Sequence, residues 1–439
     1  MPTQDMKLPG KQKQNLTSDQ IHMASRILKH IKQLVNVRSD AGPLYGKQLA
    51  ELPVIGDAYL ITEGAEIASF GKMSSLKNDH EALPREEVDC SGRLVLPCWC
   101  DSHTHIVFAG SREKEFVDRI RGLSYAEIHA RGGGILHTVQ QVEAASADDL
   151  FLEAWKRLEE VSLLGTGALE IKSGYGLSLA TELKMLRVIK QLRQKSSLTI
   201  RSTFLGAHTY PPAYREDHES YIREITEEML PVIAKEKLAD YIDVFCEKGF
   251  FNPDETERIL RAGLQHGLKP KLHCNQLNSV GGVQTGIKMN AVSLDHLEKI
   301  SAKDLESFKA SGWKGICTLL PTAANFLGMP LPEARKLLQA GCALALASDY
   351  NPGSSPSGNM NQVISMACIQ MNMLPEEAIN AATFNAAFAM ESDQSTGSIS
   401  VGKRANMIIT HPVPSLAYLP YAFGANHIDK VMIGGQFIS

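Results

Sequence analysis

Asp101-Ser102-His103-Thr104-His105 is the stretch of the sequence that says most about the fold. It closes an apolar run, Leu94-Val95-Leu96-Pro97, which is typical of a buried strand. Side chains alternate between the two faces of a strand, so His103 and His105 are expected to point the same way. Two such imidazoles can share one metal ion, but hydrogen-bonded histidines are also common in protein cores. The pair alone leaves both interpretations open.

Three more polar side chains follow strand-like runs further along the chain. His273 follows Pro270-Lys271-Leu272, His296 ends the run from Ala291, and Asp349 comes shortly after Ala343-Leu344-Ala345-Leu346. Groups at the carboxyl ends of several parallel strands are where a barrel enzyme holds its chemistry. The repeated pattern therefore favours a metal site.

Strand-like runs alternate with amphipathic helical runs through the middle of the chain, which is typical of repeated βα units. Eight strands are expected near residues 96–105, 167–173, 199–208, 241–247, 269–273, 291–296, 315–321 and 343–349. Eight units predict a closed (β/α)₈ barrel. A doubly wound open sheet is the alternative, but it would carry a Gly-rich phosphate loop after its first strand. That position has no such loop.

Both ends of the chain show short alternating segments separated by Gly, Asp and Ser, which indicates strands and turns. We expect them to form one small β-sandwich domain, with the barrel inserted between its two parts. The expected domains are residues 1–95 and 396–439 for the two parts of the β domain and 96–395 for the barrel. Residues 18–37 are compatible with a helix early and a strand near Leu34-Val35.

The composition is that of an ordinary globular protein, with 439 residues, 44% hydrophobic and 21% charged residues, and a net charge of −4. There is no basic block to predict nucleic-acid binding, and no apolar run long enough to predict a membrane span or a signal peptide. A cytoplasmic location is expected. The eight cysteines are then expected to be reduced and buried. Cys98 and Cys100 have no second pair with which to build a thiolate metal site.

From Gly56 onward the chain resembles the amidohydrolase superfamily of metal-dependent hydrolases, and most closely its members that open the imidazolone ring in histidine degradation. The stretches that carry the resemblance, strong when taken together and in this order, are Asp101 to Arg112, Arg131 to Ile135, Glu170 to Leu177, Gly206-Ala207-His208 and Ser348 to Gly353.

The metal ligands expected from the strand positions and the resemblance are His103, His105, His273 and Asp349. Three neutral nitrogens and one carboxylate suit Zn²⁺ or iron, Fe²⁺ or Fe³⁺, and leave room for a water molecule. Some superfamily members bridge two ions with a carboxylated lysine at the end of strand four. Here that strand ends Val244-Phe245-Cys246-Glu247, so one metal per subunit is expected.

The expected catalytic residues are His296, Asp349 and Gln276. His296 or Asp349 could accept a proton from the attacking water, although His296 could instead only orient its neighbours. Gln276 stands where adenosine-type deaminases, and many relatives, carry Glu. An amide cannot pass protons, so Gln276 is expected to hydrogen-bond the heterocycle, and a deaminase becomes less favoured.

For a substrate carboxylate, Arg112 is the best candidate, because its planar guanidinium can grip a carboxylate in two places. The resemblance implies further pocket residues, some of which could instead be turn or loop residues. The whole expected substrate-binding set is Arg112, Tyr125, Tyr175, His208, Gln276, Asn351, Gly353 and Ser354. His208 could also stabilise an oxyanion, and Gly132-Gly133-Gly134 is interpreted as part of a flexible loop over the pocket.

The resemblance implies hydrolysis of the cyclic amide of 4-imidazolone-5-propanoate to N-formimidoyl-L-glutamate, by a homodimer that acts on a small molecule and binds neither nucleic acid nor membrane. Two alternatives stay open. One is another mononuclear amidohydrolase, such as a deaminase of a cyclic guanidine or pyrimidine. The other is a non-catalytic protein on the same barrel, which would be expected to have lost metal ligands. The sequence does not distinguish zinc from iron.

Overall fold

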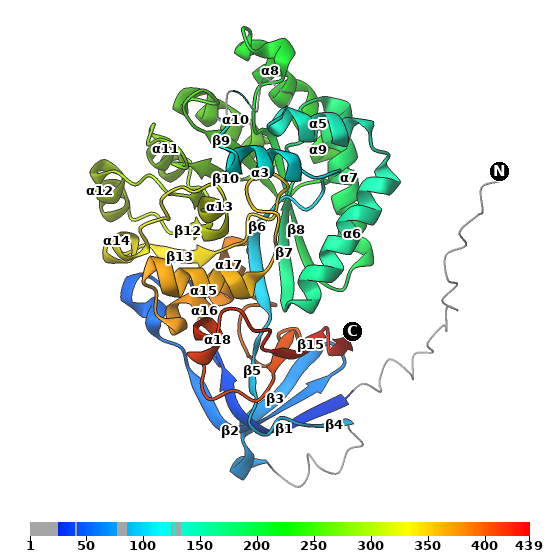
Figure 1. Cartoon of the computed structure of the whole chain (residues 1–439), viewed down its shortest axis with the longest axis vertical. Coiled ribbons are helices and arrows are strands. Elements are labelled where there is room, and N and C mark those ends of the chain that lie inside the picture. The colour runs from blue at the N-terminus through cyan, green and yellow to red at the C-terminus, as the bar shows by residue number, and fades with distance from the viewer. Residues whose placement is uncertain (1–24, 40–41, 77–85, 124–126, 128–132) are drawn as a thin grey trace, which may run out of the picture.

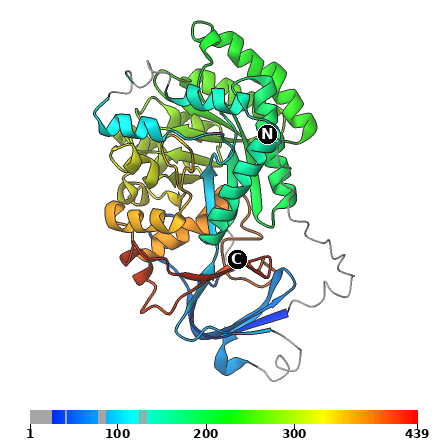
Figure 2. The same ribbon diagram turned by 45° about the vertical axis from the view of Figure 1, so that its right-hand side comes forward.

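The computed structural model describes residues 25–39, 42–76, 86–123, 127 and 133–439. Figure 1 shows two layers of structure along the long axis of the molecule: a barrel surrounded by helices and a smaller sheet beneath it. The turned view in Figure 2 shows the same arrangement. The prediction of a barrel with a β domain built from both ends of the chain is confirmed.

Eight parallel strands form the barrel, in the order β6 to β13 around the sheet. Their bounds are β6 Trp99–Thr104, β7 Thr166–Lys172, β8 Thr199–Ala207, β9 Tyr241–Cys246, β10 Lys269–Cys274, β11 Ser293–His296, β12 Ile316–Leu319 and β13 Ala343–Leu346. Almost every residue of these strands is buried, as expected for strands covered by helices outside and filled by side chains inside.

The ring closes between β6 and the segment just after β13. The amide of Asp349 donates to the carbonyl of His103 at 3.0 Å, and the amide of His105 donates to the carbonyl of Tyr350 at 2.9 Å. The buried carboxylate of Asp101 accepts hydrogen bonds from the Ser348 amide at 3.0 Å and the Ser348 hydroxyl at 2.5 Å. These bonds place the end of the first barrel strand against the end of the last.

The helices pack around the barrel and follow its strands in sequence, except α18, which follows β14 of the small sheet (Figure 1). They are α3 Glu113–Ile120, α5 Ile135–Ala144, α6 Ala147–Leu163, α7 Leu179–Lys195, α8 His218–Arg223, α9 Leu230–Glu236, α10 Pro253–Gln265, α11 Gly282–Lys288, α12 Ala302–Ser311, α13 Pro321–Phe326, α14 Ala334–Gln339, α15 Met360–Met371, α16 Pro375–Ala382, α17 Phe384–Ala389 and α18 Tyr418–Tyr421. Short 3₁₀ segments lie at Gly46–Ala50, Met73–Ser75 and Pro212–Tyr214, and a π-helical segment at Glu224–Met229 joins α8 to α9.

Local sequence signals set several helix starts. Asn252 begins α10 by accepting from the amides of Asp254 and Glu255, and the Glu255 carboxylate in turn accepts a hydrogen bond from the Asn252 amide. Ser301 and Asp304 make the same reciprocal cap at α12. Such caps satisfy amides that have no partner inside the helix. Among the described residues, no helix is both long and apolar enough to cross a membrane.

The small domain contains strands from both ends of the chain in one mixed sheet. Its strands are β1 Ser25–Val35, β2 Val54–Glu63, β3 Glu66–Lys72, β4 Glu86–Asp89, β5 Leu94–Pro97, β14 Met407–Thr410, β15 Ile428–Ile433 and β16 Gln436–Ile438. They pair in the order β16-β15-β14-β5-β1-β2-β3, with β4 beside β1. The segment that the sequence left ambiguous, near residues 25–35, is therefore strand.

One local expectation is wrong: the apolar run Leu94–Pro97 does not continue into the strand that carries the histidines. It is β5, which pairs with β1 and β14 of the small sheet, whereas β6 belongs to the barrel. The amide of Cys98 bonds Asn406 at 3.1 Å and the next amide, of Trp99, bonds Gly165 at 2.9 Å. The chain thus passes from one sheet to the other between Cys98 and Trp99. The sequence gives no sign of this break, because residues 94–100 are uniformly apolar.

Candidate metal centre and substrate pocket

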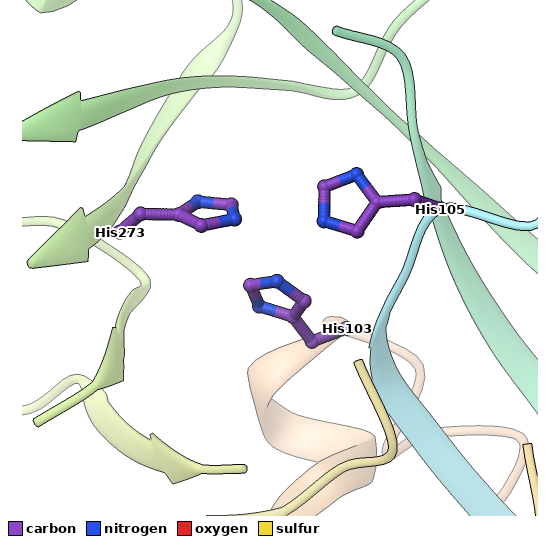
Figure 3. A group of neighbouring side chains, drawn as sticks. All are labelled: His103, His105 and His273. Carbon is purple, nitrogen blue, oxygen red and sulfur yellow. The ribbon is translucent and has the colours of Figure 1, made fainter. Parts of the chain in front are cut away.

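Three histidines converge inside the carboxyl end of the barrel (Figure 3). His103 lies on β6, His105 directly follows that strand, and His273 lies on β10. All three are buried, and one ligand nitrogen from each lies within 4.8 Å of the others. The rings point toward a common centre, so the sequence-predicted grouping of these residues is confirmed.

Two aspartates fix the orientation of two of these rings. The Nδ1 of His103 lies 2.7 Å from Asp295 Oδ2, and the Nδ1 of His273 lies 2.9 Å from Asp243 Oδ2. A carboxylate accepts, so each Nδ1 carries the proton and donates it. The opposite nitrogens, His103 Nε2 and His273 Nε2, are buried without a hydrogen-bond partner.

The donor set fits a divalent cation. Burial lowers the pKa of His103 and of His105 well below the ordinary imidazole value, so both are neutral. Neutral imidazoles with unpartnered buried nitrogens are costly without a ligand, and they are the form that binds zinc or iron. Carboxylates that hold the far side of metal-binding histidines are a recurrent feature of such sites.

Asp349 faces the same centre from the segment after β13. Its Oδ1 lies 3.6 Å from His103 Nε2 and 3.5 Å from His105 Nε2. Its backbone is left-handed, with φ of 54°, and its amide donates the hydrogen bond to His103 that closes the barrel. This position is consistent with the ligand role expected for Asp349.

His296, the last residue of β11, lies beside the three-histidine cluster, with ring centres 5.6 Å from His103 and 5.2 Å from His273. Its Nδ1 lies 3.3 Å from Glu298 Oε1, so Nε2 is the nitrogen left to accept a proton. Burial alone would lower the pKa of His296, but nearby carboxylates, Glu298 first, raise it above its ordinary value. This environment suits a proton acceptor.

A cavity of about 180 Å³ opens over this centre. Eleven of the expected site residues line it: His105, Arg112, Tyr175, His208, His273, Gln276, His296, Asp349, Asn351, Gly353 and Ser354. His103 lies fully buried in contact with His105 and His273 and does not line it. Tyr125, Gly132 and most of the expected loop over the pocket lie outside the described residues.

Arg112 lies at the N-terminus of α3 and is held by Glu115. Its Nε lies 3.0 Å from both carboxylate oxygens of Glu115, and its Nη2 lies 2.7 Å from Glu115 Oε2. This pairing leaves the N–H groups of Nη1 and the second N–H of Nη2 free for another ligand. A Cβ on Gly353 would come within 2.1 Å of Arg112 Nη1, so the absence of a side chain there makes room for the guanidinium.

His208, directly after β8, stacks on His105 with ring centres 5.5 Å apart and lies beside Tyr175. Its Nδ1 lies 3.1 Å from the carbonyl of Gly174, which can only accept, so Nδ1 carries the proton. Burial lowers the pKa of His208 to about 3, so the ring is neutral and its Nε2 accepts. In this tautomer Nε2 is an acceptor, which favours a hydrogen bond from a substrate N–H over the oxyanion contact expected from the sequence.

Asn351 shapes the loop after β13. Its Oδ1 accepts from the amides of Gly353 and Ser354, both at 2.8 Å, and its Nδ2 donates to the Asp349 carbonyl at 2.6 Å and to Ser354 Oγ at 2.7 Å. The side chain is therefore a turn-former that also lines the cavity, as the sequence allowed.

Several residues at the site were missed by the sequence reasoning. Asp243, Asp295 and Glu298 orient histidines, and Glu115 orients Arg112. Charged residues inside or next to apolar strand runs were a usable signal for the two aspartates. The apolar cavity walls Ile135, Phe245, Phe250 and Leu327 carried no signal that separates them from core residues.

Comparison with known proteins gives one family across the chain. The model of the amidohydrolase family matches residues 94–438. Imidazolonepropionase from Flavobacterium johnsoniae is 52% identical over 413 residues, covering 94% of this chain and 99% of the relative. Imidazolonepropionase from Christiangramia forsetii is also 52% identical over 413 residues, with the same two coverages.

Solved structures of lower identity share the fold. Atrazine chlorohydrolase from Arthrobacter aurescens complexed with zinc superposes with a TM-score of 0.66 at 13% identity, over 94% of each chain. E. coli guanine deaminase superposes with a TM-score of 0.68 at 13% identity, over 95% of this chain and 99% of the other. At such identities the likeness is one of architecture.

We predict that the purified protein binds about one zinc or iron ion per chain, and that His103→Ala loses most of it because the cluster is left with two imidazoles. Metal content is measured by inductively coupled plasma mass spectrometry. His411→Ala, which removes an exposed histidine of the small domain, is the control and should keep its metal. Full metal content in His103→Ala would contradict the assignment.

Proposed function

Since the chain belongs to the amidohydrolase family and, within it, to the imidazolonepropionases, we propose that it hydrolyses the cyclic amide of 4-imidazolone-5-propanoate to N-formimidoyl-L-glutamate. One observation carries the proposal beyond its family: a single cavity is lined both by His105 and His273 of the histidine cluster and by Arg112. A substrate with a reactive ring and a carboxylate arm needs both features in one cavity.

Arg112 holds the propionate. Glu115 occupies the Nε side of the guanidinium. The propionate of the substrate therefore binds Nη1 and the second N–H of Nη2, beside Gly353. A charge-assisted pair of this kind fixes direction as well as distance. The ring is thereby directed from Arg112 toward the histidines.

His208, Tyr175 and Gln276 hold the ring. Neutral His208 presents Nε2 as an acceptor for a ring N–H. Tyr175 is buried beside His105 and His208, and burial raises the pKa of its hydroxyl, which therefore stays protonated and can donate. Gln276 offers an amide that donates and accepts but does not relay protons. This set suits a ring that is recognised by hydrogen bonds and not protonated at a nitrogen.

His103, His105, His273 and Asp349 would hold a divalent ion, which would supply polarisation of the ring carbonyl and easier deprotonation of water. His296 accepts a proton at Nε2 as water attacks the carbonyl carbon, and Glu298 stabilises the imidazolium that results. Collapse breaks the C–N bond of the ring, and the proton passes from His296 to the departing nitrogen. Asp349 is the second group at which that proton can be held.

The ion is proposed to be zinc or iron, because the donor set suits both. A homodimer and a cytoplasmic location are the further expectations that the family implies, and both remain predictions.

The reaction is tested by supplying the imidazolone to purified, metal-loaded protein. Loss of imidazolone absorbance with formation of N-formimidoylglutamate, and without ammonia, is the expected result. Release of ammonia from cyclic guanidines or pyrimidines, with the imidazolone left intact, would instead identify a deaminase. No turnover by metal-loaded protein on either class would contradict the proposal.

Arg112→Ala should raise KM far more than it lowers kcat, because the carboxylate contact is present in the bound substrate and in the transition state alike. A rise on the order of a hundredfold in KM corresponds to loss of a charge-assisted pair of about 3 kcal/mol. Arg121→Ala is the matched control, since that exposed guanidinium lies at the opposite end of α3 from Arg112. Unchanged KM in Arg112→Ala would show that the propionate binds elsewhere.

His296→Gln should lower kcat by about a hundredfold or more, because it removes the proton acceptor, and it should keep its metal. Steady-state kinetics and metal analysis of the same preparation separate the two properties. Loss of metal would make His296 a ligand, and undiminished kcat would leave Asp349 as the proton acceptor.

A further inference from the structure

Beneath the three histidines, five charged side chains fill the barrel interior. We call them the charged layer: Glu170 and Lys172 of β7, Asp243 of β9, Lys271 of β10 and Asp295 of β11. All five are fully buried. Placing five charges where water is excluded is costly unless each is paired, so their arrangement is informative.

Lys172 is the centre of the charged layer. Its Nζ lies 2.7 Å from Glu170 Oε1, 2.8 Å from Asp243 Oδ2 and 3.4 Å from Asp295 Oδ2. Three carboxylates around one ammonium keep that group protonated, and the pKa of Lys172 is raised accordingly, against the effect of burial.

The oxygens that Lys172 contacts are the ones that orient the metal-binding histidines. Asp243 Oδ2 also accepts a hydrogen bond from His273 Nδ1 at 2.9 Å, and Asp295 Oδ2 also accepts one from His103 Nδ1 at 2.7 Å. One ammonium therefore lies at the junction of two carboxylate–imidazole pairs. Lys271, in contrast, pairs with the other oxygen of Glu170, which is its one carboxylate partner among the residues that the structure describes.

We propose that Lys172 is a positioning residue of the metal centre: by holding Asp243 and Asp295 in place, it directs the Nε2 atoms of His273 and His103 toward one shared cation. The layer contains three carboxylates and two ammonium groups, so its net charge is −1. Asp349 brings the total to −2, which a divalent ion neutralises. Lys172 thus affects both the geometry of the metal ligands and the net charge around the ion.

Geometry and charge predict opposite effects when the ammonium is removed. A positive charge near a cation repels it, so on charge alone Lys172→Met should bind zinc more tightly. If Lys172 acts by position, the two aspartates move when it is lost, the imidazoles turn, and zinc binds more weakly. The sign of the change in affinity therefore distinguishes the two roles.

The test measures the zinc dissociation constant of metal-free protein by competition with a chromogenic chelator, with no substrate present. Lys172→Met is expected to weaken zinc binding by about tenfold or more, the range seen when groups behind metal-binding histidines are removed. Visible absorption of the cobalt-substituted protein should also change, since it reports ligand geometry. Unchanged or tighter zinc binding would overturn the proposal.

Lys271→Met is the matched control, because it removes an equally buried ammonium from the same layer. It should destabilise the fold in thermal unfolding, as Lys172→Met does, but keep zinc affinity near that of the unaltered protein. Equal weakening in both variants would show that any lost charge disturbs the site, and the proposal would fail.

If Lys172→Met does not fold, Lys172→Arg and Lys271→Arg take the place of the two methionine variants. A guanidinium keeps the charge but cannot occupy the point shared by both aspartates, so Lys172→Arg should weaken zinc binding and Lys271→Arg should not. Zinc binding by Lys172→Arg equal to that of the unaltered protein would overturn the proposal. These readouts do not depend on which substrate the enzyme accepts.

Discussion

The site depends on the closure of the barrel between β6 and the segment after β13. Two backbone hydrogen bonds and the Asp101–Ser348 pair join these segments. Closure brings His103 and His105, at the end of β6, against Asp349 in the segment after β13, and the parallel strands between them place His273 and His296 at the same end. Because parallel strands present their carboxyl ends together, residues far apart in the chain become neighbours without a dedicated contact between them.

Within this ring the polar groups are arranged in depth. The charged layer lies deepest, the three imidazoles lie above it, and the cavity with Arg112 opens above those. Each level limits the next, since the aspartates decide which imidazole nitrogen carries a proton and the imidazoles decide where a cation can be held. Arg112 is constrained in a similar way, because Glu115 occupies the Nε side of its guanidinium and leaves Nη1 free for a ligand.

Much of the fold and of the site could be predicted from sequence, because barrel strands are short apolar runs and their chemistry follows at their ends. His103, His105 and His273 were found in this way. The residues behind them were not: a charge inside an apolar strand marked Asp243 and Asp295 as unusual, but their partners are defined only when the barrel closes. The role of His208 also needed the structure, since its proton position depends on the carbonyl of Gly174.

The small sheet also has a consequence for synthesis. β5 lies between β1, which precedes it, and β14, which is made only after the whole barrel. While the ribosome elongates the chain, β5 can pair with β1 but keeps one open edge until residues 407–410 emerge. Open edges of apolar strands invite pairing with other chains, so the unpaired edge of β5 is an aggregation hazard for most of the protein's translation.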